Sequence, residues 1–153
     1  MHTLTRTQRL PISLERAWDF FSSPYNLSLI TPPYMNFRIL SNTGGEKMYE
    51  GQIITYRVSP LASVPLFWMT EITHVKEYEY FIDEQRVGPY AVWHHEHRFK
   101  AIQGGIEMTD MVTYKLPLGV LGKLVHALWV KRSVEYIFDY RYQALEERFG
   151  KFL

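Results

Sequence analysis

Hydrophobic and polar residues alternate along much of the chain, which is the pattern of strands with one buried face. Between residues 36 and 111 the chain is rich in aromatic and β-branched residues, and Gly- or Pro-containing turns interrupt it. With a first strand at 4–12, the pattern predicts seven antiparallel strands joined largely as a meander. The other six are expected at 37–41, 52–59, 66–74, 78–86, 91–102 and 106–116.

Helical signals occur after the first strand and at the C-terminal end. Ser13 fits an N-cap for a short helix that extends to about Phe21, and Ser23-Pro24 begins a second one that ends before Pro32-Pro33. Beyond Pro117 the hydrophobic spacing changes to steps of three and four, which predicts one long amphipathic helix. Its stripe is expected at Leu121, Leu124, Leu128, Glu135, Phe138, Tyr142, Leu145 and Phe149. Gly119 and Gly122 are expected to let the chain turn into this helix. Lys131, Arg132 and Arg141 are expected on its solvated face, and contact with an anionic ligand or partner is the alternative.

The strand at 91–102 carries a different chemistry on each face, because successive side chains of a strand point to opposite sides. One face has, in order, Trp93, His95, His97 and Phe99. The other has His94, Glu96, Arg98 and Lys100, a set typical of solvent exposure. The first face is therefore predicted to be buried, although a plain core would have Val or Leu in place of the two imidazoles.

Composition narrows the class of protein. A chain of 153 residues that is 46% hydrophobic suits one compact domain over 1–153. The net charge of +1, from 17 basic and 16 acidic residues spread along the chain, gives no electrostatic footprint for nucleic acid. Without cysteine there is no disulfide framework or thiolate nucleophile. No signal peptide and no membrane span is recognisable, so we expect a soluble cytoplasmic protein, and no motif predicts a cofactor.

The order of elements resembles that of the START-like superfamily, also called SRPBCC, which includes the birch pollen allergen and the polyketide cyclases. Gly88-Pro89-Tyr90, Trp93–Phe99 and the segment 110–122 are similar to a bacterial subfamily described as ligand-binding, cyclase/dehydrase-like or cell-division-inhibitor-like. Some of its members are fused to a nucleotide-sugar epimerase domain. The resemblance covers essentially the whole chain. It implies an α+β helix-grip fold, in which a curved seven-stranded antiparallel sheet wraps the long C-terminal helix and leaves an internal cavity.

Within that architecture, alternation predicts the residues of the cavity wall. Pairing across the Gly104-Gly105 hairpin allows Asp110, Val112 and Tyr114 to share the inner face with the two histidines. The charge of Glu71 marks the outer face of 66–74, and Tyr56 is added from a strand whose two faces look alike. The predicted ligand-binding residues are Tyr56, Trp68, Thr70, Phe81, Asp83, Trp93, His95, His97, Phe99, Asp110, Val112 and Tyr114.

Several roles for His95 and His97 remain open at this stage. Each can form a buried pair with an aspartate of a neighbouring strand that fixes register and binds nothing, or it can contact a ligand. A metal site would need Asp110 as a third ligand, which is a weak signal, so no metal is predicted. An acid–base role for His95, His97 and Asp110 is the remaining alternative.

The favoured function is non-covalent binding of a small hydrophobic or aromatic molecule in the cavity. The alternative is an enzyme similar to polyketide cyclases or dehydratases, with a cavity histidine as acid–base. A third hypothesis, implied only by the fusions in the resembling subfamily, is a regulatory module for an epimerase-like protein partner.

Overall fold

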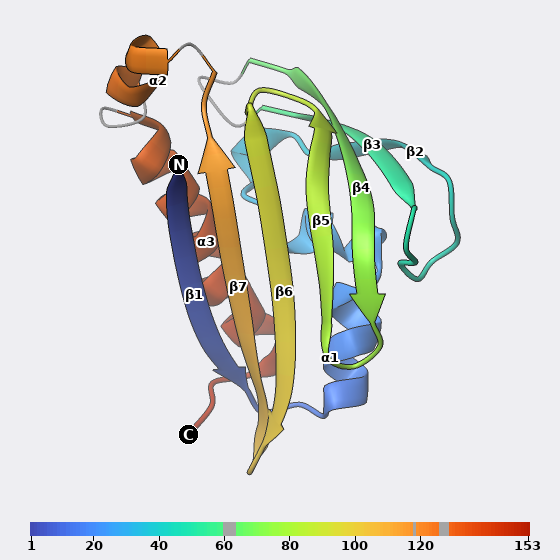
Figure 1. Ribbon diagram of the computed structural model, residues 1–153. Coiled ribbons are helices and arrows are strands. Elements are labelled where there is room, and N and C mark those ends of the chain that lie inside the picture. Colours follow the sequence, from blue (N-terminus) through green and yellow to red (C-terminus); the bar gives the residue numbers. More distant parts are fainter. Residues whose placement is uncertain (60–63, 118, 126–128) are drawn as a thin grey trace.

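The protein consists of a seven-stranded antiparallel sheet with helices on one of its faces (Figure 1). The structure is a computed structural model that describes residues 1–59, 64–117, 119–125 and 129–153. Its elements are, in chain order, β1 (His2–Leu10), α1 (Leu14–Phe21), the 3-10 helices η1 (Pro24–Ile30) and η2 (Pro33–Met35), β2 (Arg38–Asn42), β3 (Ile53–Val58), β4 (Leu66–Lys76), β5 (Tyr80–Val87), β6 (Val92–Ile102), β7 (Gly105–Lys115), α2 (Gly119–Val125) and α3 (Lys131–Phe149).

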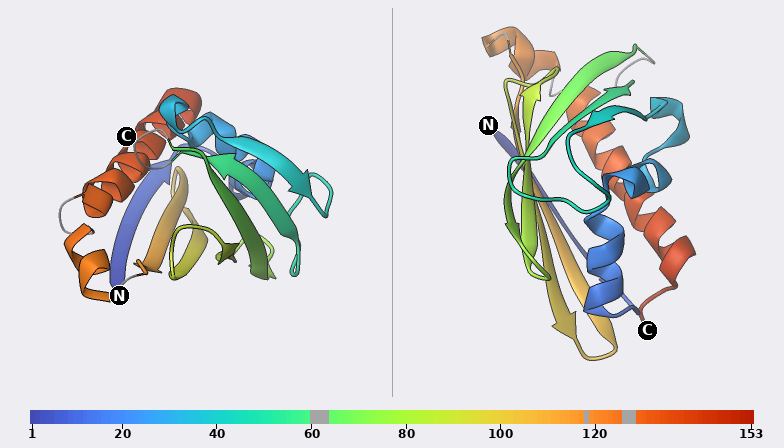
Figure 2. Two further views of the ribbon diagram at one scale, coloured as in Figure 1. Left: turned by 90° about the horizontal axis from the view of Figure 1, so that it is seen from above. Right: turned by 90° about the vertical axis from the view of Figure 1, so that its right-hand side faces the viewer.

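The strand order is β1-β7-β6-β5-β4-β3-β2, so β2 to β7 form a meander. β1 is the edge strand beside β7. Every neighbouring pair is antiparallel. The sheet is curved, and α1, α3 and the 3-10 segments lie on its concave face (Figure 2). The predicted α+β architecture is thereby confirmed.

Several element ends differ from the predicted ones, for local reasons. β1 ends at Leu10 rather than at residue 12, because Pro11 has no N–H to donate to the sheet. There the strands come so close that a Cβ atom at Gly105 would collide with the Leu10 carbonyl oxygen. Tyr78 adopts a left-handed backbone (φ 64°) in the turn before β5, so that strand starts later than predicted. The second short helix is the 3-10 helix η1, which ends at Ile30 before Pro32 as predicted, and η2 follows it. The first short helix, α1, has the predicted cap, in which Ser13 Oγ accepts from the Arg16 N–H.

The long C-terminal helix is confirmed as α3, but it begins at Lys131 and not directly after Pro117. The shorter α2 is set off from α3, beyond the N-terminal end of β1 (Figure 1). Leu121 and Leu124 of the predicted stripe lie on α2 and are exposed, while Leu128 lies outside the described residues. Within the described part of the chain, no helix is both long and apolar enough to cross a membrane.

α3 is anchored to the concave face by a stripe that differs from the predicted one. Phe138 and Leu145 are buried as expected, but the other buried residues of the helix are Val134 and Arg141, while Tyr142 is exposed. The helix is also tied to β1, where Gln8 Nε2 donates to the Tyr142 carbonyl oxygen at 2.9 Å. The core divides into one hydrophobic cluster around Tyr56, Trp68 and Phe138 and another around Trp18, Phe99 and Leu145.

Candidate functional site

A cavity of about 150 Å³ lies between the concave face of the sheet, η1 and α3. Most of its wall is apolar, with aromatic side chains from β3, β4, β5 and β6 and aliphatic ones from η1 and α3. Polar side chains interrupt this wall, among them Tyr56, Thr70, Asp83, His95, His97 and Arg141. Such a mixture of apolar area with a few polar groups is typical of small-molecule sites.

Four side chains from three adjacent strands form a group at the cavity, called here the His–Asp cluster: Asp83, His95 and His97, which line the cavity, and Asp110, which does not. Strand register brings them together, because Asp83 of β5 pairs with His95 and Asp110 of β7 pairs with His97. Alternation then turns all four toward the concave face. The hairpin of β6 and β7 thus places Asp110 on the same face as the two histidines, as the sequence predicts.

Hydrogen bonds in the cluster run diagonally. His95 Nε2 lies 3.1 Å from Asp110 Oδ1, and His97 Nε2 lies 3.0 Å from Asp83 Oδ2. The directly opposed pairs are also close. His95 Nδ1 lies 3.4 Å from Asp83 Oδ2, and His97 Nδ1 lies 2.8 Å from Asp110 Oδ1, although the angle of the second contact is unsuitable for a hydrogen bond. The two imidazole centroids are 3.7 Å apart. Each carboxylate therefore contacts both imidazoles.

The pKa values of these groups depend on burial, which disfavours the charged form, and on neighbouring charges. Burial alone would raise the pKa of Asp110, but its contacts with His95 and His97 and the charge of Arg141 hold that pKa well below the usual range. The pKa of Asp83 is lowered by the same balance. Burial and the charge of His97 lower the pKa of His95, whereas for His97 the two carboxylates outweigh burial and raise the pKa. These shifts favour ionised carboxylates, and they favour a proton on His97 over one on His95.

Aromatic rings hold the two imidazoles in place. Phe81 stacks on His97 with centroids 4.2 Å apart, and Phe138 of α3 meets His95 edge-on at 5.5 Å. The side chains of both histidines are less than one-tenth exposed, and both line the cavity. The buried-pair and ligand-contact interpretations are thus compatible, because each imidazole contacts aspartates and also borders the cavity.

Arg141 is the main site residue that sequence reasoning missed. It was expected on the solvated face of the helix, but it is buried and lines the cavity, with Nη1 3.8 Å from Asp110 Oδ1. Its spacing from Phe138 and Leu145 follows the steps of three and four of the buried stripe. That periodicity was the available signal, and the charge of the side chain obscured it.

The predicted ligand-binding residues divide into two groups. Those that line the cavity are Tyr56, Trp68, Thr70, Phe81, Asp83, Trp93, His95 and His97. Four others are buried but do not line it: Phe99 packs with Trp18 and Phe21, Asp110 lies behind the imidazoles, and Val112 and Tyr114 belong to the core. Alternation predicted the face of the sheet correctly, but it could not show which part of that face borders the cavity.

Tyr90 is a second lining residue that was absent from the prediction. It precedes β6 and is held by Gln85, which accepts from its N–H at 3.2 Å and donates to its carbonyl oxygen at 2.6 Å. Its ring meets Trp68 edge-on and lies 4.8 Å from that of Trp93, centroid to centroid. Gly88-Pro89-Tyr90 was noted only as part of the family resemblance, since loop residues have no alternation from which to predict a direction.

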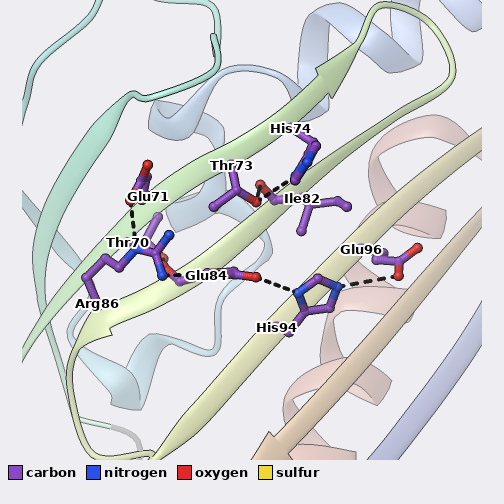
Figure 3. A network of polar contacts seen from close by, with 9 residues as sticks. All are labelled: Thr70, Glu71, Thr73, His74, Ile82, Glu84, Arg86, His94 and Glu96. Atoms are coloured by element: carbon purple, nitrogen blue, oxygen red, sulfur yellow. Dashed lines mark hydrogen bonds and ion pairs between the residues drawn. The ribbon is translucent and has the colours of Figure 1, made fainter.

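The outer face of the same strands carries a chain of charges (Figure 3). Arg86 bridges Glu71 and Glu84, and His94 lies between Glu84 (2.8 Å) and Glu96 (3.4 Å). Partial burial would lower the pKa of His94, but the two glutamates outweigh it and raise the pKa. This face matches the prediction that charged residues of these strands point away from the cavity.

The cluster also has the residue types of a metal site. Asp83, His95 and His97 could each offer one ligand atom, and these atoms lie within 4.8 Å of one another. The ring nitrogens already contact carboxylates, however, and Arg141 adds a positive charge beside the cluster. A cation would have to displace these contacts, so the prediction that no metal resides here is kept.

Comparison with known proteins identifies the fold. No protein-family model and no curated protein matches the chain. Among solved structures, protein Ms6760 from Mycobacterium smegmatis is 20% identical, with 95% of this chain and 92% of that one covered and a TM-score of 0.67. Protein CV1439 from Chromobacterium violaceum is 10% identical, with 98% of both chains covered and a TM-score of 0.74.

Ara h 8.0201, a Bet v 1 homologue, is 17% identical to this chain, with 95% of both chains covered and a TM-score of 0.61. At such identities the likeness shows the fold alone. The protein has the helix-grip fold of Bet v 1 and START-like proteins.

Proposed function

We propose that the protein binds a small apolar molecule non-covalently in the cavity between its sheet and α3. The observation that carries the proposal is the cavity itself, whose wall is mostly apolar and includes a few polar side chains. A cavity of about this volume can hold a single aromatic ring. The helix-grip fold adds support at the level of analogy, because proteins with a Bet v 1-like fold generally bind small hydrophobic ligands.

Native mass spectrometry of the protein purified from its own source tests this proposal. We expect a retained small molecule, and aromatic or fatty compounds that raise the melting temperature of the emptied protein. A variant with the cavity filled, Ile137→Trp, should lose this stabilisation, whereas Tyr136→Trp, at an exposed neighbouring position of α3, should keep it. A protein that carries no adduct and that no compound stabilises would contradict the proposal.

An enzyme with a cavity histidine as acid–base, of the cyclase or dehydratase type, is the second candidate. In its favour, two imidazoles line the cavity with centroids 3.7 Å apart, and their surroundings lower the pKa of His95 and raise that of His97. In a dehydration, neutral His95 would take a proton from a carbon beside a carbonyl group. The C–H electron pair would form the double bond, and His97 would protonate the departing hydroxyl group to give water.

The molecule that the His97→Gln variant retains when it is purified from the same source serves as the substrate in the test of this candidate. Incubation with the parent protein should remove one water from it, and His97→Gln should slow that loss by about 100-fold or more. An unchanged molecule would contradict the enzyme and leave the binding function standing. An epimerase-like partner rests on the family resemblance alone and stays an expectation.

A further inference from the structure

Arg141 lines the cavity, and among the described residues at least one of its N–H donors has no acceptor. A guanidinium has five N–H donors and no acceptor. Arg141 is only 8% exposed, and its guanidinium lies 3.8 Å from Asp110 and 4.9 Å from the centre of the Phe138 ring. Within the described residues, its buried Nε has no hydrogen-bond partner. A buried donor of this kind calls for an acceptor from another molecule.

A second unmatched donor borders the same cavity. The indole Nε1 of Trp68 is buried, and no hydrogen bond of ordinary geometry satisfies it among the described residues, although the Tyr56 hydroxyl group is its neighbour. An indole N–H can only donate. Of the three cavity-wall nitrogens without a well-aligned partner among the described residues, His97 Nδ1 lies 2.8 Å from a carboxylate oxygen of Asp110, whereas Arg141 Nε and Trp68 Nε1 can only donate and lack a well-aligned acceptor.

The charges around Arg141 decide what kind of acceptor fits. Asp83 and Asp110 carry two negative charges and Arg141 one positive charge, while Tyr56 is a neutral phenol. Because the two imidazoles are only 3.7 Å apart, protonation of one disfavours protonation of the other, so together they add at most one positive charge. The His–Asp cluster and Arg141 together therefore have no net positive charge. An anion would be repelled by the two carboxylates. A cation would be repelled by Arg141 and would bring further donors.

We propose that the cavity binds a neutral molecule through a carbonyl oxygen that accepts a hydrogen bond from the Arg141 guanidinium, while its apolar part packs against the aromatic wall. This inference rests on the proposed binding function and adds the chemical class of the ligand. A carbonyl oxygen supplies the missing acceptor without bringing a charge into the buried cluster.

Two probes of nearly equal shape test the inference on the parent protein. Acetophenone has a carbonyl oxygen where α-methylstyrene has a CH₂ group, and transfer from water favours burial of the hydrocarbon. The two dissociation constants are measured by calorimetric titration near pH 7, with benzoate as the anionic comparison. We expect acetophenone to bind about tenfold more tightly than α-methylstyrene, and benzoate more weakly than acetophenone.

Variants of two arginines on α3 show whether Arg141 causes the preference. Arg141→Met should reverse it, so that α-methylstyrene binds at least as tightly as acetophenone. Arg132→Met, at an exposed position, should leave the preference unchanged. If Arg141→Met does not fold, Arg141→Lys replaces it, and a smaller preference for the ketone than in the parent is then expected.

The outcomes separate this inference from the function on which it rests. If no probe binds the parent, the binding function fails. If α-methylstyrene binds as tightly as acetophenone, or benzoate binds most tightly, the cavity binds ligands but the carbonyl inference is overturned. A ketone preference that survives unchanged in the Arg141 variant overturns the role of that residue.

Discussion

Asp110 shows at the residue scale how the site depends on compensated charge. Its side chain is 4% exposed, and its neighbours are two imidazoles and a guanidinium. Removal of a carboxylate from water is costly, and only close partners offset that cost. The residue lies behind the cavity wall, so it holds His95 and His97 in position and does not itself border the cavity.

Asp110→Asn should lower the free energy of unfolding by about 3–5 kcal/mol near pH 7, because buried positive charge loses its partner. The pKa of Asp110 in the folded state is lowered, so its stabilising contribution is present above the unfolded value of about 4 and is lost as pH falls. The difference between parent and variant should therefore shrink with acidification, as measured by urea unfolding between about pH 7 and pH 3.

Glu107→Gln is the matched control on the same strand. Glu107 forms a surface pair with Arg9 on the opposite face of β7, so a change of about 0–1 kcal/mol is expected. A difference between parent and Asp110→Asn that stays constant with pH would contradict the electrostatic role of Asp110.

The metal content of the cluster is a further prediction at this scale. Elemental analysis of protein purified without a metal resin should find well under one equivalent of zinc or iron, because the ring nitrogens of His95 and His97 already contact carboxylates. A full equivalent that disappears in His95→Ala and His97→Ala would refute this prediction.

At the scale of elements, the two C-terminal helices differ in how they stabilise the fold. α3 presents Val134, Phe138 and Leu145 to the concave face, and all three are at most 4% exposed. The leucines of α2 are exposed instead. Since stabilisation follows buried apolar area, α3 should contribute far more than α2.

Alanine substitutions in the two helices test this difference by denaturant unfolding. Leu145→Ala removes a side chain with no exposed surface and should cost about 2–5 kcal/mol. Leu121→Ala, on α2, should change stability by less than about 0.5 kcal/mol. Equal costs would mean that α2 packs on the protein as tightly as α3.

At the scale of the whole molecule, α3 and the sheet depend on each other. The sheet has its helices on the concave face, and both hydrophobic clusters combine strand residues with residues of α3 (Figure 2). Without α3, the inner face of the sheet would expose its aromatic side chains to water.

Removal of residues 118–153 should therefore abolish cooperative unfolding, monitored by far-ultraviolet circular dichroism with increasing denaturant. Removal of 151–153 alone, which lie beyond α3, should leave the transition cooperative. A chain without α3 that still unfolds in one sharp transition would refute the dependence of the sheet on this helix.

The sequence by itself determined the strands and the direction of their side chains. Alternation assigned His95, His97, Asp83 and Asp110 to the buried face and His94 and Glu96 to the outer one, as the structure has them. A period of two can be recognised within a single segment, so it needs no knowledge of neighbouring elements. The order of elements was equally local, and it implied the helix-grip fold through a resemblance.

Only the tertiary structure decided which buried residues border the cavity and how the charges combine. Phe99 and Trp93 share one face of β6, but the first packs under α1 and the second lines the cavity. Arg141 was assigned to solvent because a lone charge is normally exposed. The carboxylate of Asp110, a residue about 30 positions away on another element, offsets the cost of burying this charge. Charge compensation and the space between elements depend on contacts between distant segments, and no local pattern records them.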